Sequence, residues 1–566
     1  MEEEWSHHLR VLAQSGSGRE AVDPLQPPPQ LHHLLQSVNK LYEMCKAENS
    51  ADLVARIYPQ MNKLFQRFIA SASNSSGLLL LAILQFFVDF GEIALHDADP
   101  SIRTFFRSCL SRQFTDPLVA MATFDFLNRN KIKLLSAFPS LLPQYFPLFL
   151  KLIAWNGEML EKQFLALLPG LMAPGSFLPL FPALTDLPTL VVALENSEGS
   201  SGSFVGNNTD FIQKSQTPEQ NLLQLMDEAY TGSTIEDRGG DSGDENVGCR
   251  DDADALFLDL LKDENDGLAE RHWTSQGMAA TLQAAMGSAQ SERLKQVFRV
   301  APRIVEEYFR IALHDFNHSL ICALIPLIMA RNDALFPDKK FASEIRKCLF
   351  EFMLSAFERS PQFISLLKKP IMDRIGEAFD SPAKTELAMQ LCWAIGEHGG
   401  GGISHKDVAR ELFEGLELLL YENLSSSRLA LNNDMVGNYE GAILKKSGQA
   451  RFLCFVVTAI AKLATYHREL IPRARVCLAK VARSRHVLEK TVWRRARDYL
   501  GLMTEPAICL SILGPSSGCH DRAATVRWSE GGTKAVAHIP FYILGEKEGS
   551  PFHDFSLSEI LGKTET

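Results

Sequence analysis

Apolar residues recur at intervals of three and four along the first third of the chain, and this spacing predicts amphipathic helices. Leu34, Leu35, Val38 and Leu41 form one apolar stripe, and a second stripe runs from Leu53 to Phe68. Pro, Gly, Ser and Asp residues interrupt the pattern often enough to leave helices of roughly ten to twenty residues. The strict alternation and the β-branched runs of a buried sheet do not occur in this part of the sequence. The pattern therefore predicts short helices joined by short turns, as in a bundle or a solenoid.

The helical periodicity returns near Met278 and continues to about Met503. Apolar stripes mark nine predicted helices in this region: Arg293–His314, Leu320–Ala330, Phe341–Phe357, Phe363–Phe379, Lys384–Glu397, His405–Leu424, Ala450–Tyr466, Arg473–Arg483 and Val487–Met503. Helices of this length with short connections are typical of stacked pairs of the HEAT or armadillo kind, whose repeat is about forty residues long. The predicted fold is all-α, an α-solenoid of HEAT/armadillo-like helical pairs.

Changes of composition divide the chain into five parts. They are a flexible N-terminus (residues 1–29), an N-terminal helical solenoid (30–195), an acidic, mostly disordered linker (196–275), a C-terminal helical solenoid (276–505) and a small β-containing tail (506–566). The linker is rich in Ser, Gly, Asn, Asp and Glu, which bury too little apolar surface to offset the entropy of ordering. Two amphipathic islands interrupt it, at residues 222–229 and 255–261. In the tail, Gly531 and Gly532 form the turn of a predicted β-hairpin appendage.

The composition narrows the classes of function. A formal net charge of −11 argues against general nucleic-acid binding, because neutralising phosphates requires a basic surface. The ten cysteines lie far apart without a C-x-x-C pair, which is typical of reduced, buried thiols in the cytosol. The histidines show no spacing typical of a metal site, and no sequence motif indicates a cofactor.

The N-terminus and the apolar segments bear on location. The first ten residues, MEEEWSHHLR, are acidic and no apolar segment follows them, unlike a secretory signal. The apolar stretches Leu78–Val88 and Phe177–Leu194 are too short, or too often broken by proline, to cross about 30 Å of hydrocarbon. We therefore expect a cytoplasmic protein that is not transmembrane.

One short motif resembles that of an enzyme. Residues Gly514 to Gly518 read G-x-S-x-G, with Ser516 at the position of the nucleophile in a serine hydrolase. That chemistry requires a strand before the serine and a helix after it, and here Pro515 lies inside the motif and the preceding chain is helical. A Gly/Ser turn after the last helix fits these residues better, and a serine hydrolase using Ser516 is kept as an alternative.

A cluster of basic residues marks the last predicted helix. Lys490, Arg494 and Arg497 are spaced by four and seven positions, so they share one helix face. Such a face is a possible contact for an acidic partner or an anionic lipid headgroup. The alternative is a solvated face that pairs with Glu489 and Asp498.

Three residues near the end of the helix before residue 398 are read as packing residues. Trp393 is expected to fill the gap between stacked helices, and Gly396 to allow close packing or to end the helix. Glu397 is expected to reach the N-terminus of a neighbouring helix. All three roles suit a scaffold.

These residues also carry a resemblance to a known family. Trp393 to Glu397 read W-x-I-G-E, and Arg495 to Tyr499 read R-A-x-x-Y, with the helix of Ala459 to Leu463 between them. The same segments occur in this order in the trunks of large adaptin subunits, where Arg495 and Tyr499 would be packing residues. The segment Leu178–Glu195 and the short C-terminus without an ear domain are most similar to the zeta-type large subunits of the fifth adaptor-protein complex.

The resemblance implies a non-enzymatic subunit of a heterotetramer with a beta-type large subunit, a medium subunit and a small subunit. It also implies association with spatacsin and spastizin, and vesicle-mediated protein sorting at late endosomes and lysosomes. Membrane association would then be peripheral and would occur through the complex. An importin-like transport receptor, which is also a solenoid, stays open as an alternative, and binding to a nucleotide-loaded small GTPase would distinguish it.

Overall fold

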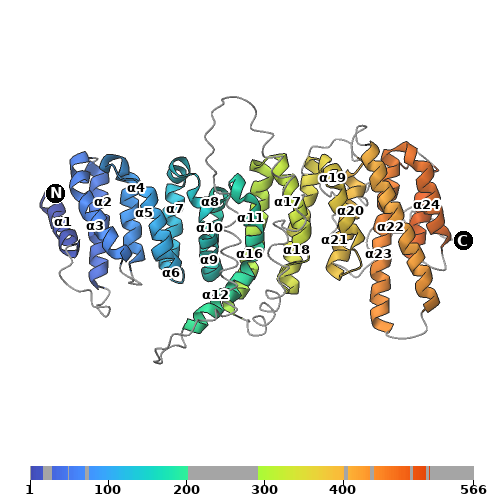
Figure 1. The fold of residues 1–566 in the computed structure, drawn as a ribbon, viewed down its shortest axis with the longest axis horizontal. Helices are drawn as coiled ribbons and strands as arrows, with labels where there is room; N and C mark the ends of the chain where they lie inside the picture. The colour runs from blue at the N-terminus through green and yellow to red at the C-terminus, as the bar shows by residue number, and fades with distance from the viewer. Residues whose placement is uncertain are drawn as a thin grey trace, which may run out of the picture. The chain divides into compact units, whose positions relative to one another are not determined.

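Helices account for all the regular structure among the described residues of the computed structural model (Figure 1). The described residues are 2–16, 29–48, 50–70, 76–201, 291–400, 406–433, 439–484, 489–504 and 509. The predicted all-α solenoid is confirmed for this part of the chain. The predicted hairpin at Gly531 and Gly532, both amphipathic islands of the linker and Ser516 lie outside the described residues.

Contacts between Cα atoms divide the chain into two units. The helices of the first unit are α1 (Glu2–Gly16), α2 (Pro29–Glu48), α3 (Ala51–Ala70), α4 (Gly77–Ala94), α5 (Ala98–Phe105), the π-helix η1 (Phe106–Leu110), α6 (Ser111–Gln113), α7 (Pro117–Ala137), α8 (Leu141–Gln144), α9 (Phe146–Asn156), α10 (Glu158–Leu171), α11 (Pro174–Thr185), α12 (Leu187–Ser201) and α16 (Glu292–Asp315). Helix α1 lies in the stretch that the sequence pattern leaves as a flexible N-terminus, and it packs on α2 and α3. Helix α12 continues five residues past 196, into the stretch assigned to the linker.

Helices α4, α7, α10 and α16 are neighbours in that order, and the contacts between them show that they run in the same direction. Asn128 and Lys131 of α7 donate hydrogen bonds to the carbonyl oxygens of Gln163 and Ala166 of α10, at 2.9 Å in both cases. The residue numbers rise together on both helices, so the two helices are parallel. Parallel neighbours in one layer are what stacked antiparallel helix pairs produce.

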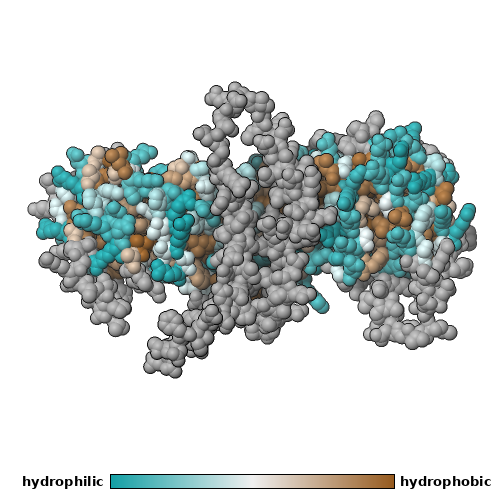
Figure 2. All heavy atoms as spheres, in the orientation of Figure 1, coloured by the Kyte–Doolittle hydropathy of each residue, from teal (hydrophilic) through white to brown (hydrophobic). Residues whose placement is uncertain are grey.

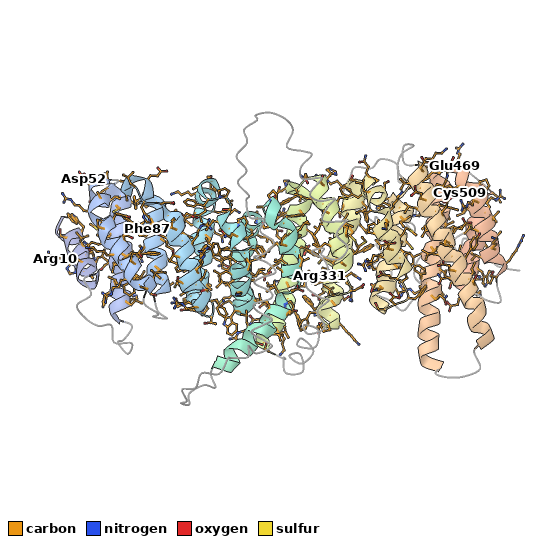
Figure 3. All side chains as sticks on the ribbon, viewed as in Figure 1. Arg10, Asp52, Phe87, Arg331, Glu469 and Cys509 are labelled. Atoms are coloured by element: carbon orange, nitrogen blue, oxygen red, sulfur yellow. The ribbon has the colours of Figure 1, made fainter. Side chains whose placement is uncertain are left out.

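The core of the first unit is built from aromatic rings between the layers. Phe87 of α4 lies inside the unit (Figure 3), with its ring 5.7 Å from that of Phe65 and 6.0 Å from that of Tyr58. Helix α16, which follows residues 202–290, joins the same core: Tyr308 is fully buried, stacks on Phe177, and donates a 2.8 Å hydrogen bond to the Phe177 carbonyl oxygen. The core of this unit therefore combines helices from both sides of the acidic segment.

A half-buried carboxylate ties three of these helices together. Asp89 of α4 accepts hydrogen bonds from Tyr42 of α2 and from Gln85, both at 2.7 Å, and pairs with Lys133 of α7 at 2.5 Å. Burial alone would raise the pKa of Asp89, but the hydrogen bonds from Lys133, Tyr42 and Gln85 outweigh it and hold the pKa below its usual value. A carboxyl group with a depressed pKa stabilises the folded state above its unfolded pKa of about 3.9, and this contribution is lost as the pH falls through the folded pKa.

We expect Asp89→Asn to lower the free energy of unfolding of the first unit by about 1–2 kcal/mol at pH 7, a value discounted for partial exposure. Below about pH 4 the difference from the wild type should shrink, because the carboxylate is then lost in the wild type as well. Urea denaturation at pH 7 and at pH 3 measures the cost of the substitution at each pH. Asp125→Asn, at an exposed carboxylate of α7, is the matched control. An equal cost at both pH values would contradict the assignment.

The second unit contains α17 (His318–Arg331), the part of α18 (Lys339–Arg359) from Arg346 onward, α19 (Gln362–Leu366), α20 (Lys368–Gly376), α21 (Pro382–His398), α22 (Lys406–Asn433), α23 (Tyr439–Tyr466), the 3-10 helix η3 (Arg468–Leu470), α24 (Ile471–Arg483) and α25 (Lys490–Leu502). The predicted helix Phe363–Phe379 is interrupted at Leu367, between α19 and α20. The other predicted helices of this region correspond to α16, α17, α18 and α21 to α25, with ends shifted by up to eleven residues.

Helices of the second unit lie in two layers. In one layer, salt bridges connect α20, α22 and α24: Lys368 pairs with Glu411, and Arg473 pairs with Glu414 at 2.7 Å and with Glu417 at 2.6 Å. In the other layer, α23 packs against both α21 and α25. Most side chains in the ion pairs between α20, α22 and α24 are partly exposed. Each pair therefore contributes only roughly 0–1 kcal/mol to the free energy of unfolding. Stability must come mainly from the apolar surface between the layers.

Two segments, Gly77–Ala94 and Gly448–Tyr466, are helical, long and apolar enough to span a bilayer by composition alone. In the structure α4 packs against α2, α3 and α7, and α23 packs against α21, α22 and α25, with 56% and 83% of their apolar segments buried. Packing inside a layered helical core accounts for their composition. On the face shown in Figure 2, hydrophilic residues cover most of the described surface and hydrophobic residues form small separate patches.

Candidate functional site

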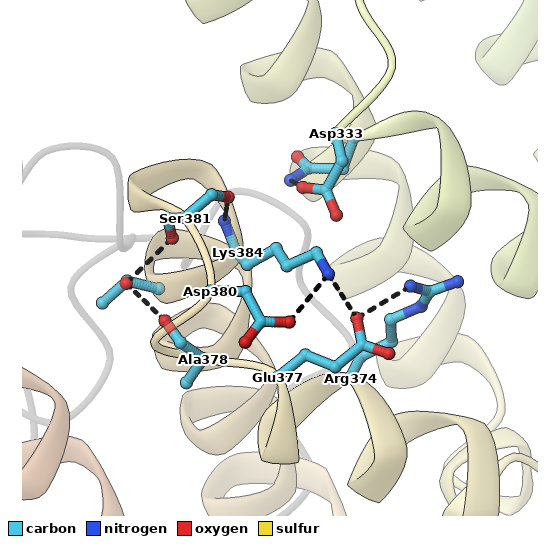
Figure 4. A network of polar contacts seen from close by, with 9 residues as sticks. Asp333, Arg374, Glu377, Ala378, Asp380, Ser381 and Lys384 are labelled. Atoms are coloured by element: carbon cyan, nitrogen blue, oxygen red, sulfur yellow. Dashed lines mark hydrogen bonds and ion pairs between the residues drawn. The ribbon is translucent and has the colours of Figure 1, made fainter. Parts of the chain in front are cut away.

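Helix α21 starts at a polar network that orders the turn after α20 (Figure 4). Ser381 caps the helix by accepting a hydrogen bond from the backbone N–H of Lys384. The Lys384 ammonium pairs with Asp380 at 3.1 Å and with Glu377 at 2.9 Å, and Arg374 also pairs with Glu377, at 3.0 Å. Burial would raise the pKa of Glu377, but the two cations hold it below its usual value. The network fixes where α21 begins.

At its other end α21 approaches α23 very closely. A Cβ atom built on Gly396 would lie 3.3 Å from the Cα atom of Ala459 and 3.4 Å from Cδ of Lys462. Small residues at a crossing point let two helix backbones come near each other. Of the two roles predicted for Gly396, close packing or helix termination, this geometry favours the first.

Next to this contact lies a buried ion pair. The Lys462 ammonium contacts the Glu397 carboxylate, and the two side chains are only 5% and 6% exposed. Burial lowers the pKa of Lys462 to about 7. Glu397 lies opposite Lys462 in the last turns of α23, and its expected contact with a helix N-terminus stays a prediction. The carboxylate is needed there to compensate a buried cation.

Side chains at the end of α23 contact backbone carbonyl oxygens at the end of α21. Tyr466 donates a 2.8 Å hydrogen bond to the carbonyl oxygen of Glu397, and a ring nitrogen of His467 lies 2.8 Å from that of Gly400. A Cβ atom on Gly400 would lie 2.3 Å from the Tyr466 ring, so no other residue fits there without movement. The start of the glycine run therefore serves as a packing surface for Tyr466.

The second motif segment packs on α23 from α25. The hydroxyl groups of Tyr499 and Thr458 are 2.9 Å apart, and Arg495 is buried in the same helix. Burial raises the pKa of Tyr499, and the nearby Arg495 guanidinium and the Thr458 hydroxyl reduce this effect. Both motif segments thus meet one helix: α21 meets it at Ala459 and Lys462, and α25 meets it at Thr458. We call this arrangement the α21–α23–α25 seam.

Trp393 lies one turn before Gly396. Its ring meets those of Phe350 in α18 and His398 edge to face, with centroids 6.3 Å and 6.4 Å apart. The indole N–H is buried and has no hydrogen-bond partner among the described residues. The ring is partly exposed, and it connects α18 to the start of the seam.

The basic residues that the sequence predicts as a partner or lipid contact lie on α25. Lys490 and Arg497 are exposed and Arg494 is half-buried, while the Arg497 guanidinium lies over the Trp493 ring at 5.7 Å. The seam contacts described above come from other residues of α21, α23 and α25. Their role as a contact for an acidic partner or a lipid headgroup stays a prediction.

Sequence reasoning named the helix of Ala459 to Leu463 only as part of the adaptin resemblance and predicted no contacts for its residues. Lys462 is the most informative of them, since it is a lone cation within the apolar run from Phe455 to Ala464. A lysine in such a run needs a buried partner. That signal alone would have predicted a carboxylate opposite it.

The chain was compared with families of known proteins. A family described as an AP-5 complex subunit in vesicle trafficking matches residues 30–151, and one described as the C-terminal TPR repeats of AP-5 complex subunit zeta-1 matches residues 251–531. The chain belongs to the AP-5 zeta subunit family. TPR repeats are paired-helix solenoid repeats, in agreement with the stacked helices of this family member.

Two relatives of the AP-5 zeta family are similar over most of the chain. AP-5 complex subunit zeta-1 of Mus musculus is 25% identical over 534 residues, covering 91% of this chain and 59% of the mouse protein. The protein of the same name from Homo sapiens is 25% identical over 452 residues, covering 78% of this chain and 50% of the human protein. The chain therefore spans between half and three fifths of the length of these curated relatives. No solved structure matches it.

Proposed function

We propose that this chain is a non-enzymatic large subunit of a heterotetrameric AP-5 adaptor complex, in which it acts as a helical scaffold. Its partners in the proposal are a beta-type large subunit, a medium subunit and a small subunit. The observation that carries the proposal is the match of AP-5 zeta family descriptions to both helical regions.

The architecture supports a scaffold. Stacked helical layers offer long surfaces on which each partner meets side chains from several consecutive helices. The α21–α23–α25 seam holds consecutive helices in fixed register through contacts that are internal to the chain, including the buried pair of Glu397 and Lys462. A rigid surface loses little entropy when a partner binds.

The proposed site of action is the cytoplasmic face of late endosomes and lysosomes, in protein sorting. The chain would reach these membranes peripherally, through the complex, and would associate with spatacsin and spastizin. These points rest on the adaptin resemblance of Trp393–Glu397 and Arg495–Tyr499.

Affinity purification of the tagged full chain from cells tests the proposal. We expect three further chains at equal stoichiometry, identified by mass spectrometry as a beta-type large, a medium and a small adaptor subunit. Trp393→Phe keeps an apolar ring between α18 and α21 and should retain them, whereas Trp393→Glu places a charge there and should release them. Recovery of the wild-type chain without any adaptor subunit would contradict the proposal.

A further inference from the structure

Leu95, at the turn between α4 and α5, has an unusual backbone and an unusual exposure. Its φ of 52° and ψ of 43° put it in the left-handed region, where it is the only non-glycine residue with positive φ in the described part of the chain. Its side chain is 94% exposed. Glycine or asparagine is the usual residue at the end of a helix in this conformation, and a leucine there costs the fold free energy.

The turn that presents Leu95 is held firmly. The backbone N–H groups of Leu95 and His96 both point to the carbonyl oxygen of Gly91, the second at 2.8 Å. A Cβ atom on Gly91 would lie 2.7 Å from the His96 carbonyl oxygen, so glycine is required for this close approach. The left-handed conformation is therefore built into the turn.

The residue after Leu95 anchors the turn to the core. The two ring nitrogens of His96 are hydrogen-bonded, one to the Tyr58 hydroxyl at 3.0 Å and the other to the Ser101 hydroxyl at 3.2 Å. The imidazole ring packs 4.3 Å from the ring of Phe87, which lies inside the unit (Figure 3). With His96 fixed below it, Leu95 has little freedom to fold back onto the protein.

One exposed apolar residue and two exposed acidic residues lie close to Leu95 in the sequence. Ile93, two residues earlier, is 42% exposed, and Glu92 and Asp97 are both exposed. Neither acidic side chain makes an ion pair within the described residues. The matching surface is an apolar pocket bordered by Lys or Arg side chains.

We propose that Leu95 is an anchor residue that inserts into a basic-rimmed apolar pocket on another subunit of the adaptor complex. The inference rests on the proposed function, which supplies the partner subunits. The exposed side chain of Leu95 and its strained backbone do not stabilise the free chain. Residues with strained backbones occur most often at functional sites, so this conformation supports a functional role. An anionic membrane is a poorer occupant, because Glu92 and Asp97 would be repelled by it.

The test uses the full chain and a separately purified subcomplex of the beta-type large, medium and small subunits. Leu95→Gly removes the side chain, Leu95→Asn replaces it with a polar one, and both residues suit the left-handed backbone, so both variants should melt within about 2 °C of the wild type or above it. Both should weaken binding to the subcomplex by about tenfold or more, as loss of an interface anchor does. Glu92→Lys should slow association, most strongly at low salt.

Leu118→Ala is the matched control, since Leu118 is 65% exposed on α7 of the same unit but has an ordinary helical backbone. It should bind as the wild type does. If the wild type binds the subcomplex and Leu95→Gly binds equally well, the anchor is refuted and the proposed function stands. If the wild type does not bind, the proposed function fails and the anchor with it. Loss of self-association, or of binding to anionic vesicles, as the only effect of Leu95→Gly would also overturn the inference.

Discussion

Replacing Glu397 with alanine is expected to lower the free energy of unfolding of the second unit by about 3–5 kcal/mol. The substitution leaves the ammonium of Lys462 buried without its carboxylate between α21 and α23. A single buried charge is far more costly than a buried pair, because desolvation is no longer compensated. Urea denaturation, together with hydrogen exchange of the amides in α21 and α23, measures the loss.

The double variant Glu397→Leu/Lys462→Met should recover most of this stability, since apolar side chains of similar volume can replace a buried pair at little cost. Burial lowers the pKa of Lys462 to about 7 in the wild type, and removing the adjacent carboxylate cannot raise it. In the variant the unfolded chain therefore binds more protons than the folded one between about pH 7 and the unfolded pKa of about 10.4, so the stability of Glu397→Ala should rise over that range. Glu411→Ala, at a partly exposed pair with Lys368 in the same unit, is the control and should cost at most about 1 kcal/mol. An equally small cost for Glu397→Ala would refute the buried pair.

Replacing Tyr308 with alanine is expected to destabilise the first unit by about 3–5 kcal/mol. The ring is fully buried between α16 and α11, stacked 5.5 Å from Phe177 and 6.1 Å from Phe181. Its removal opens a cavity where α16 joins the earlier helices. Tyr308→Phe keeps the ring and removes only the 2.8 Å hydrogen bond to the Phe177 carbonyl oxygen, so it should cost about 1–2 kcal/mol.

Limited proteolysis provides a second readout for Tyr308→Ala, because α16 should become the most readily cleaved helix of the unit. Ile132→Ala, at an 82% exposed side chain of α7, should change the free energy of unfolding by less than about 0.5 kcal/mol. If Tyr308→Ala behaves like this control, α16 is not part of the core of the first unit.

The helices were predictable from the sequence because each helix buries one apolar stripe. Such a stripe can be recognised in the sequence of the helix alone, without knowing which helix it packs against. Helix α16, for example, was expected at Arg293–His314 and runs from Glu292 to Asp315. The ends of α22 and α23 were not predicted: both helices are longer than their apolar stripes. How far a helix extends past its apolar stripe depends on the helix propensity of the following residues and on their tertiary contacts. The spacing of apolar residues contains no information on either.

The seam was predictable only in part. Trp393 and Gly396 are interpreted as packing residues from their type and position in a helix, and Tyr499 from the adaptin resemblance. Their partners on α23 are not predictable, because pairing between residues 65 and 41 positions apart depends on how the layers stack. The conformation of Leu95 was not predictable either, since leucine is a common helix former and the sequence carries no glycine or asparagine at the turn to mark it.

The most direct test of the scaffold role is the mass of the assembled particle. The full chain, of 63.1 kDa, is co-expressed with the beta-type large, medium and small adaptor subunits, and the purified material is analysed by native mass spectrometry. The account predicts one stable species that contains a single copy of each of the four chains. A species with the mass of this chain alone, in the presence of the other three subunits, would contradict it.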